Sequence, residues 1–140
     1  LSLVTASADE ATRALSQLKR IIRASYSNPP THGARLVERV LTTPALRADW
    51  ERELTMMRER IKAMRQALVE QVQVAGQNVD FSFVLRQNGM FSYSGLTRED
   101  VARLREEFAI YAVDSGRICV AALNSGNVAR VGAAVATLLR

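Results

Sequence analysis

Apolar residues recur at three- and four-residue steps through the first 42 residues and predict helices there. A first helix is predicted from an S-x-x-E capping box at Ser7 to about Arg23, because the "NPP" run at 28–30 cannot continue it. The preceding "LSLVTAS" is a short strand candidate. A second helix is predicted over about His32 to Leu41, and its apolar residues are expected to be buried: Leu36, Val37, Val40 and Leu41.

The longest periodic segment runs from Pro44 to about Val74. Its apolar stripe consists of Trp50, Leu54, Met57, Ile61, Met64 and Leu68. About 30 residues give ~45 Å of helix, whereas a compact domain of this length has a radius of gyration of only ~14 Å. We therefore predict a helix that links two modules, one of them largely missing. The stripe is interpreted as core packing in preference to a partner-binding surface.

Beyond Asp80 the pattern changes from helical to alternating. The stretches "DFSFVLRQ" and "GMFSYSG" are predicted to be strands joined by a hairpin turn at Asn88-Gly89. A helix capped by Thr97 and Asp100 follows, with its buried side formed by Val101, Leu104 and Phe108.

Two further strands are predicted in "IYAV" and "RICVAAL". A last helix, "VARVGAAVATLLR", is predicted after a cap at Asn124 or Ser125. The order β-β-α-β-β-α gives an α+β layer in which two helices lie against a short sheet. Arg117 lies between two runs that are predicted to be buried strands. Because an arginine rarely enters apolar surroundings without a partner, its position needs an explanation.

Composition and charge limit the possible partners. With 140 residues, 48% of them apolar, the chain is long enough for one ordinary soluble domain with a real core. The net charge of +5 and the sequence pI of about 10.1 raise the question of nucleic acid. However, the basic residues alternate with acids, as in Glu59 and Lys62 at i,i+3, which favours solvated, ion-paired helix faces. No membrane segment is predicted, and the lone cysteine, Cys119, is expected to be a small buried thiol.

Two arginines, Arg23 and Arg117, are the remaining candidate ligand-binding residues. No metal-ligand cluster, nucleophile triad or glycine-rich phosphate loop is readable, and the single histidine, His32, is interpreted as a helix-start residue. Arg23 precedes the Asn-Pro-Pro break, and Arg117 lies between strands. Each offers a bidentate fork for a carboxylate, so a substrate with two carboxylates is one interpretation. Capping of helix carbonyls by the helix-end arginine remains the alternative.

Four stretches together resemble the C-terminal part of the aspartate and aromatic amino-acid aminotransferases, enzymes of fold type I that depend on pyridoxal phosphate. They are "IIRASYSNPPTHGARLV", "WERELTMMRERIKAMR", "DFSFVLRQNGMFSYSGL" and "LREEFAIYAVDSGRICVAALN". The resemblance covers essentially the whole chain in order. It implies an α/β protein whose residues 1–43 are the last elements of the large domain, 44–75 the interdomain helix and 76–140 the small domain.

The resemblance also implies site residues. Arg117 matches the arginine that grips the substrate α-carboxylate, and Phe91 matches an aromatic residue that covers the substrate beside it. Arg23 matches the arginine that reaches across the dimer interface to the side-chain carboxylate of dicarboxylic substrates. The loop residues Tyr26, Ser27 and Asn28 match neighbours of the partner subunit's site.

The cofactor residues of the family are expected upstream of this chain. Neither Lys19 nor Lys62 stands in the family's Schiff-base lysine motif, so we expect a fragment that binds no pyridoxal 5'-phosphate and is inactive alone. The parent is expected to be a cytoplasmic homodimer that moves an amino group from aspartate, glutamate or an aromatic amino acid to a 2-oxo acid such as 2-oxoglutarate. A non-catalytic interaction module that keeps the fold is the alternative.

Overall fold

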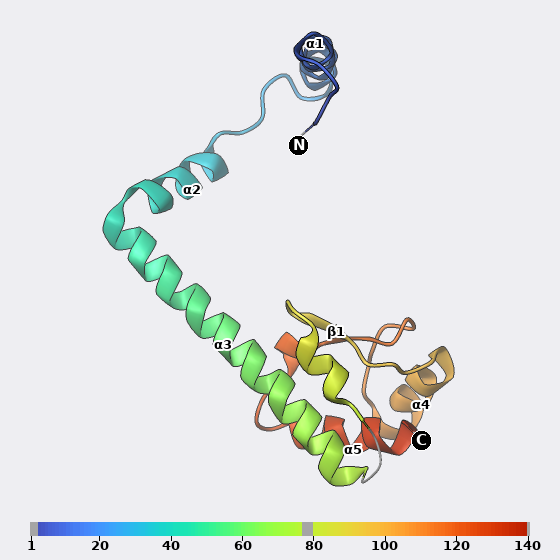
Figure 1. Cartoon of the computed structure of the whole chain (residues 1–140). Coiled ribbons are helices and arrows are strands. Elements are labelled where there is room, and N and C mark those ends of the chain that lie inside the picture. The colour runs from blue at the N-terminus through green and yellow to red at the C-terminus, as the bar shows by residue number, and fades with distance from the viewer. Residues whose placement is uncertain (1–2, 77–79, 140) are drawn as a thin grey trace. The chain divides into compact units, whose positions relative to one another are not determined.

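The computed structural model of the chain describes residues 3–76 and 80–139. Within these ranges the chain is mostly helical and contains two short strands (Figure 1). Its contacts divide it into two compact units, Leu1–Trp50 and Glu51–Arg140. Helix α3 (Pro44–Ala75) contributes residues to both units.

The first unit contains helices α1 (Ala8–Ser25) and α2 (His32–Thr42). The predicted cap forms, because the Ser7 hydroxyl accepts a hydrogen bond from the Glu10 N–H at 3.2 Å. The predicted strand was wrong for the residues described, since 3–7 adopt no regular structure.

The predicted burial of α2 was also wrong. Leu36, Val37 and Leu41 are exposed, Val40 is only half-buried, and neither α1 nor α2 contains a buried residue. Both helices carry an apolar face, yet no element described within this unit covers it. The period of the sequence thus predicted the helices correctly but not what they pack against.

Helix α3 extends over the predicted segment and contains 32 residues. Its apolar stripe is buried only toward the C-terminal end, where Ile61 and Met64 are half-buried and Leu68 is fully buried. The interpretation as core packing was therefore wrong for the first half of the stripe, whose side chains are exposed: Trp50, Leu54 and Met57.

The core of the second unit joins the end of α3 to helices α4 (Arg98–Phe108) and α5 (Val128–Leu138). Its fully buried side chains include Leu68, Val72, Phe81, Val84, Val101, Val120 and Val135. The predicted capping box starts α4, since the Thr97 hydroxyl and the Asp100 carboxylate each bond the other's backbone N–H. Helix α5 approaches α3 so closely that a Cβ on Gly132 would lie 2.4 Å from the Cβ of Gln71.

The predicted hairpin was wrong because "DFSFVLRQ" is not a strand. It contains the 3₁₀ helix η1 (Ser82–Arg86), which follows a hydrogen bond from the Ser82 N–H to the Asp80 carboxylate at 2.9 Å. Phe81 and Val84 are the fully buried residues, so burial recurs every three residues instead of every two.

The two strands that form are β1 (Phe91–Tyr93) and β2 (Arg117–Cys119), which pair antiparallel. Each predicted strand was too long or absent. Residues 110–113 are irregular, and Val120–Ala122 form the 3₁₀ helix η2. The sheet has two strands, separated in sequence by α4, so the predicted order β-β-α-β-β-α was wrong in the part described while the α+β character holds.

The last helix begins at Val128 as predicted, but the predicted cap was wrong. Its N-cap residue is Asn127, not Asn124 or Ser125, and its side chain accepts a hydrogen bond from the Asn124 N–H at 2.8 Å. Asn124 in turn accepts a bond from the Gly126 N–H, so both asparagines shape a turn ahead of the helix.

Candidate functional site

The candidate site lies on the outer face of the two-stranded sheet. The register pairs Phe91 with Cys119 and Tyr93 with Arg117, and side chains of paired residues share a face. The Val120 N–H donates to the Met90 carbonyl and the Ser94 N–H to the Gly116 carbonyl, and hydrogen-bonded pairs alternate with non-hydrogen-bonded ones along the ladder. The pairs Phe91–Cys119 and Tyr93–Arg117 are therefore non-hydrogen-bonded pairs. In such pairs the side chains lie closest together.

Arg117 and Phe91 are diagonal neighbours in this register. Diagonal positions are within reach of long and aromatic side chains. The guanidinium carbon of Arg117 lies 4.8 Å from the centroid of the Phe91 ring, which is a cation–π contact. Both side chains are exposed, Phe91 by 43%, so the stacked guanidinium presents its N–H groups to solvent.

The expectation that Arg117 lies between buried strands was wrong. It begins β2 at the exposed end of the strand, after a turn in which Gly116 adopts φ 77°. A Cβ at Gly116 would lie 2.4 Å from the Leu96 carbonyl oxygen, so both the dihedral angle and the close approach require glycine. Cys119, expected to be buried, is free and only partly buried on β2.

The buried arginine is Arg65 of α3, which sequence reasoning missed. Only 5% of it is exposed, and it donates to the Ser92 hydroxyl at 3.3 Å and to the Gly89 carbonyl at 2.5 Å. Its position carried a signal, since it lies four residues after Ile61 and three before Leu68, on the buried side of the helix.

Gln87 holds the other edge of β1. Its side-chain amide donates to the Tyr93 carbonyl at 3.0 Å and accepts from the Tyr93 N–H at 2.7 Å, in the manner of a neighbouring strand. Tyr93 is thus held from β2 on one edge and from Gln87 on the other. Sequence reasoning did not identify this residue either.

Arg23 belongs to the first unit, where it lies in the last turn of α1. Its Nη1 donates to the Ser27 hydroxyl at 2.8 Å, across a turn in which Ser27 adopts φ 65°. Tyr26 and Asn28 flank this serine; the Asn28 N–H donates to the Tyr26 carbonyl at 2.8 Å, and the Tyr26 ring is exposed. The structure therefore brings together Arg23 and Ser27 in one unit, and Arg117 and Phe91 in the other.

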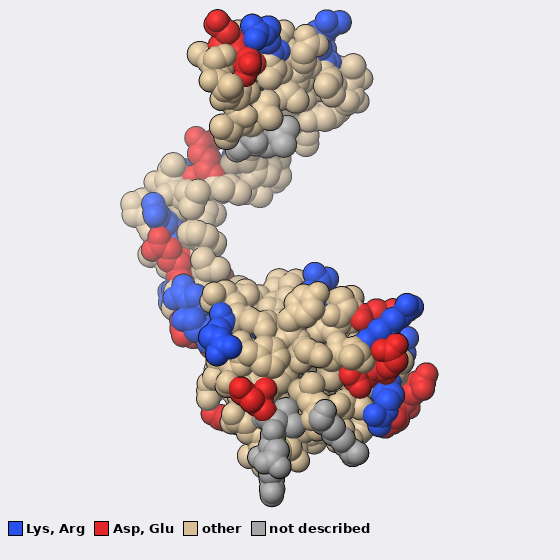
Figure 2. Space-filling view, turned by 45° about the vertical axis from the view of Figure 1, so that its right-hand side comes forward, with Lys and Arg blue, Asp and Glu red and all other residues tan. Residues whose placement is uncertain are grey.

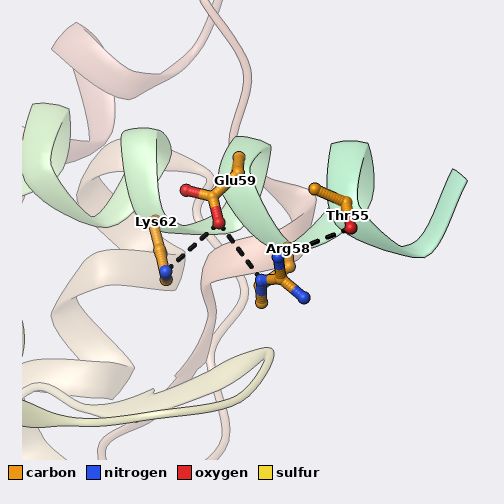
Figure 3. A network of polar contacts seen from close by, with 4 residues as sticks. All are labelled: Thr55, Arg58, Glu59 and Lys62. Atoms are coloured by element: carbon orange, nitrogen blue, oxygen red, sulfur yellow. Dashed lines mark hydrogen bonds and ion pairs between the residues drawn. The ribbon is translucent and has the colours of Figure 1, made fainter. Parts of the chain in front are cut away.

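Other charges of the second unit form exposed ion pairs. Glu59 accepts from Arg58 at 3.1 Å and from Lys62 at 3.2 Å, which confirms the predicted Glu59–Lys62 pair (Figure 3). The hydrogen bond from Arg58, supported by that from Lys62, lowers the pKa of Glu59. Figure 2 shows acidic and basic side chains side by side on the face in view. This mixture agrees with solvated, ion-paired helix faces.

Neither lysine of this chain lies in surroundings that fit an imine-forming amine. Lys62 is exposed with its Nζ 3.2 Å from the Glu59 carboxylate, and Lys19 is exposed on α1. Neither amine is enclosed as an imine-forming lysine requires. Within residues 3–76 and 80–139, no three metal-ligating side chains converge, and no helix is long and apolar enough to cross a bilayer.

The fold and the motifs around both arginines define an aminotransferase chain. It belongs to the family described as aminotransferase class I and II, whose profile matches residues 3–135. The aspartate aminotransferase of Pseudomonas aeruginosa is 60% identical over 139 residues, and the aromatic-amino-acid aminotransferase of Escherichia coli is 48% identical over 139 residues. Each match covers 99% of this chain and 35% of the relative, so the chain spans about a third of the length of these relatives.

Solved structures agree. An aromatic-amino-acid aminotransferase from Burkholderia pseudomallei, covalently bound to pyridoxal phosphate, matches with a TM-score of 0.87 and 60% identity. That match covers 98% of this chain and 34% of the other. A mitochondrial aspartate aminotransferase from Trypanosoma brucei gives a TM-score of 0.86 at 45% identity, covering 97% and 36%. The fold type I relationship is therefore established.

Proposed function

We propose that this chain provides the substrate α-carboxylate site of a pyridoxal-phosphate-dependent aspartate or aromatic aminotransferase, with Arg117 as the binding residue. The observation that carries the proposal is the exposed Arg117 guanidinium stacked 4.8 Å from the Phe91 ring centre. Stacking leaves the edge of the guanidinium open, and that edge matches the two oxygens of a carboxylate. Phe91 also provides an apolar wall beside the bound group.

We further propose that Arg23 binds the second carboxylate of dicarboxylic substrates across a homodimer interface. Its bond to Ser27, on a left-handed turn, orients the side chain at the end of α1. Tyr26 and Asn28 would then line the neighbouring part of the partner's site. The names of the relatives, aspartate and aromatic aminotransferases, support an amino acid and a 2-oxo acid as substrates.

The remaining parts of the proposal follow the family's organisation. Residues 1–43 would belong to the large domain, 44–75 to the interdomain helix and 76–140 to the small domain. The exposed apolar faces of α1 and α2 support a role against further protein surface, which we assign to the rest of a homodimeric enzyme. The free Cys119 agrees with a reducing compartment, which we propose to be the cytoplasm.

Pyridoxal phosphate, when bound in the complete enzyme, supplies the electron sink for amino-group transfer. This chain contributes substrate positioning alone, and its two lysines take no part in that chemistry. The 140-residue chain mixed with pyridoxal phosphate should therefore show no specific imine absorbance. Borohydride reduction that fixes the cofactor to Lys19 or Lys62 specifically would contradict this assignment.

Kinetics of the complete aminotransferase that carries this sequence test the two arginines. Hydrogen bonds to charged groups contribute about 1.5–3 kcal/mol, so R117K should lower kcat/KM about 10- to 100-fold for every amino acid and 2-oxo acid. R23K should lower it for aspartate and 2-oxoglutarate and leave aromatic substrates nearly unchanged. Equal, small effects of R117K on all substrates would overturn the proposal.

A further inference from the structure

Arg65 is a buried cation whose hydrogen bonds go to neutral groups. It is 5% exposed, and its acceptors are the Ser92 hydroxyl and the Gly89 carbonyl oxygen. Removing a guanidinium from water is costly even when it is hydrogen-bonded, and neutral acceptors compensate less than a carboxylate does. Stability alone is therefore a poor explanation for an arginine here.

The two bonds bracket the residue that stacks on Arg117. Gly89 lies two positions before Phe91, and Ser92 lies one position after it. Ser92 is 2% exposed and points to the inner face of the sheet, whereas Phe91 and Tyr93 point to the outer face. Arg65 thus contacts β1 on the inner face of the sheet, whereas the Arg117 guanidinium stacks on the outer face.

The strand needs such support because its ladder is short. Strands β1 and β2 have three residues each, and an isolated two-stranded pair of this length is marginal in water. The turn before β1 includes Gly89 at φ 82°. Because glycine can adopt many other backbone conformations, this turn is not fixed by its own sequence. The bond from Arg65 to the Gly89 carbonyl fixes this turn, and the bond to Ser92 fixes the middle of the strand.

We propose that Arg65 is a positioning residue for the α-carboxylate site: by holding residues 89–92 against α3, it keeps the Phe91 ring under the Arg117 guanidinium. Arg65 acts through β1 and does not touch the substrate. This inference rests on the proposed function of Arg117 and adds the residue on which the geometry of that site depends.

The test compares variants of the full 140-residue chain by ¹⁵N–¹H NMR. The Nε–H resonance of Arg117 reports the ring current of Phe91, and F91A defines its position without the ring. R65M keeps a long side chain but removes both bonds, so it should move this resonance toward the F91A position. R65K, which keeps a donor that can reach one acceptor, should restore part of the shift.

Arg60 provides the matched control. It lies on the same helix and donates to two backbone carbonyls, those of Ala121 and Leu123, beyond the end of β2. R60M should lower the thermal midpoint to a similar degree as R65M but leave the Arg117 resonance in place. If Arg65 had a purely structural role, R65M and R60M would shift the Arg117 resonance equally, or neither variant would shift it.

Titration with succinate separates this inference from the proposed function. R65M should weaken succinate binding about two- to fivefold. This is the loss of affinity expected when the cation–π contact between Phe91 and Arg117 no longer orders the arginine. An unchanged resonance and affinity in R65M, with both changed in F91A, would overturn the role of Arg65 alone. Unchanged affinity in R117K would overturn the carboxylate site itself. If R65M does not fold, S92A decides, since it should move the same resonance in the same direction.

Discussion

The contact between α5 and α3 at Gly132 gives a prediction whose size can be worked out. A Cβ at this position would lie 2.4 Å from the Gln71 Cβ, 3.2 Å from the Gln71 carbonyl carbon and 3.3 Å from the Val72 nitrogen. Carbon atoms pack favourably at about 3.5–4.0 Å, so G132A requires the two helices to separate locally by about 1 Å. The nearest atoms belong to the backbone or to its first side-chain carbon, and none of them can rotate away.

Two opposing effects set the magnitude. Replacing glycine by alanine inside a helix stabilises it by about 1 kcal/mol, whereas overpacking a core costs about 1–3 kcal/mol. Because the clash at Gly132 is severe, we take the upper value and expect a net loss of about 2 kcal/mol. For a unit of this size, 1 kcal/mol shifts the thermal midpoint by about 4–8 °C, so the expected decrease is about 8–16 °C.

Circular dichroism at 222 nm measures the transition, and amide signals of α4 and α5 assign it to the second unit. G33A is the control: this glycine lies in α2, and a Cβ added there would meet no atom within 4 Å beyond its own helix backbone, so alanine should be neutral or slightly stabilising. A raised midpoint in G132A would refute the close helix contact and leave helix propensity as the dominant effect.

Two further predictions concern the caps and exposed charges of the second unit. T97A should destabilise it by about 1 kcal/mol in urea unfolding, because the Asp100 N–H loses its acceptor, while T97S should keep most of the stability. The hydrogen bond from Arg103 lowers the pKa of Glu107. The small stabilisation from this ion pair is therefore fully present above the ordinary glutamate pKa and is lost as the pH falls through the lowered pKa. In a ¹³C NMR titration, R103Q should raise the Glu107 midpoint and leave that of Glu59 unchanged; equal midpoints before and after the substitution would contradict the assigned ion pair.

Local signals in the sequence predicted the helices well. Ser7 and Thr97 begin α1 and α4 as expected, because a capping hydroxyl acts within a few residues of itself. The period of apolar residues likewise predicted α3 from Pro44 almost to its end at Ala75. Such features depend on neighbours in sequence, which the sequence displays directly.

The strands and the buried arginine depended on distant neighbours. The alternation in "DFSFVLRQ" has the period of a strand, but Asp80 starts a 3₁₀ turn, and the fully buried residues Phe81 and Val84 are three positions apart. Arg117, expected in buried surroundings, is exposed, while Arg65 is buried because the Gly89 turn, 24 residues away, supplies its acceptor. The resemblance to the aminotransferases identified the family correctly; the roles of Arg23 and Arg117 stay predictions.

The double hydrogen bond between Gln87 and Tyr93 has a consequence for self-association. An open strand edge offers alternating N–H and C=O groups that can recruit a strand from another molecule and start aggregation. Here one glutamine amide occupies both groups of Tyr93, and on the opposite side the Val113 N–H occupies the Arg117 carbonyl. These contacts occupy part of each outer edge of the sheet, at Tyr93 and at Arg117, and so leave fewer backbone groups there to recruit a strand from another molecule.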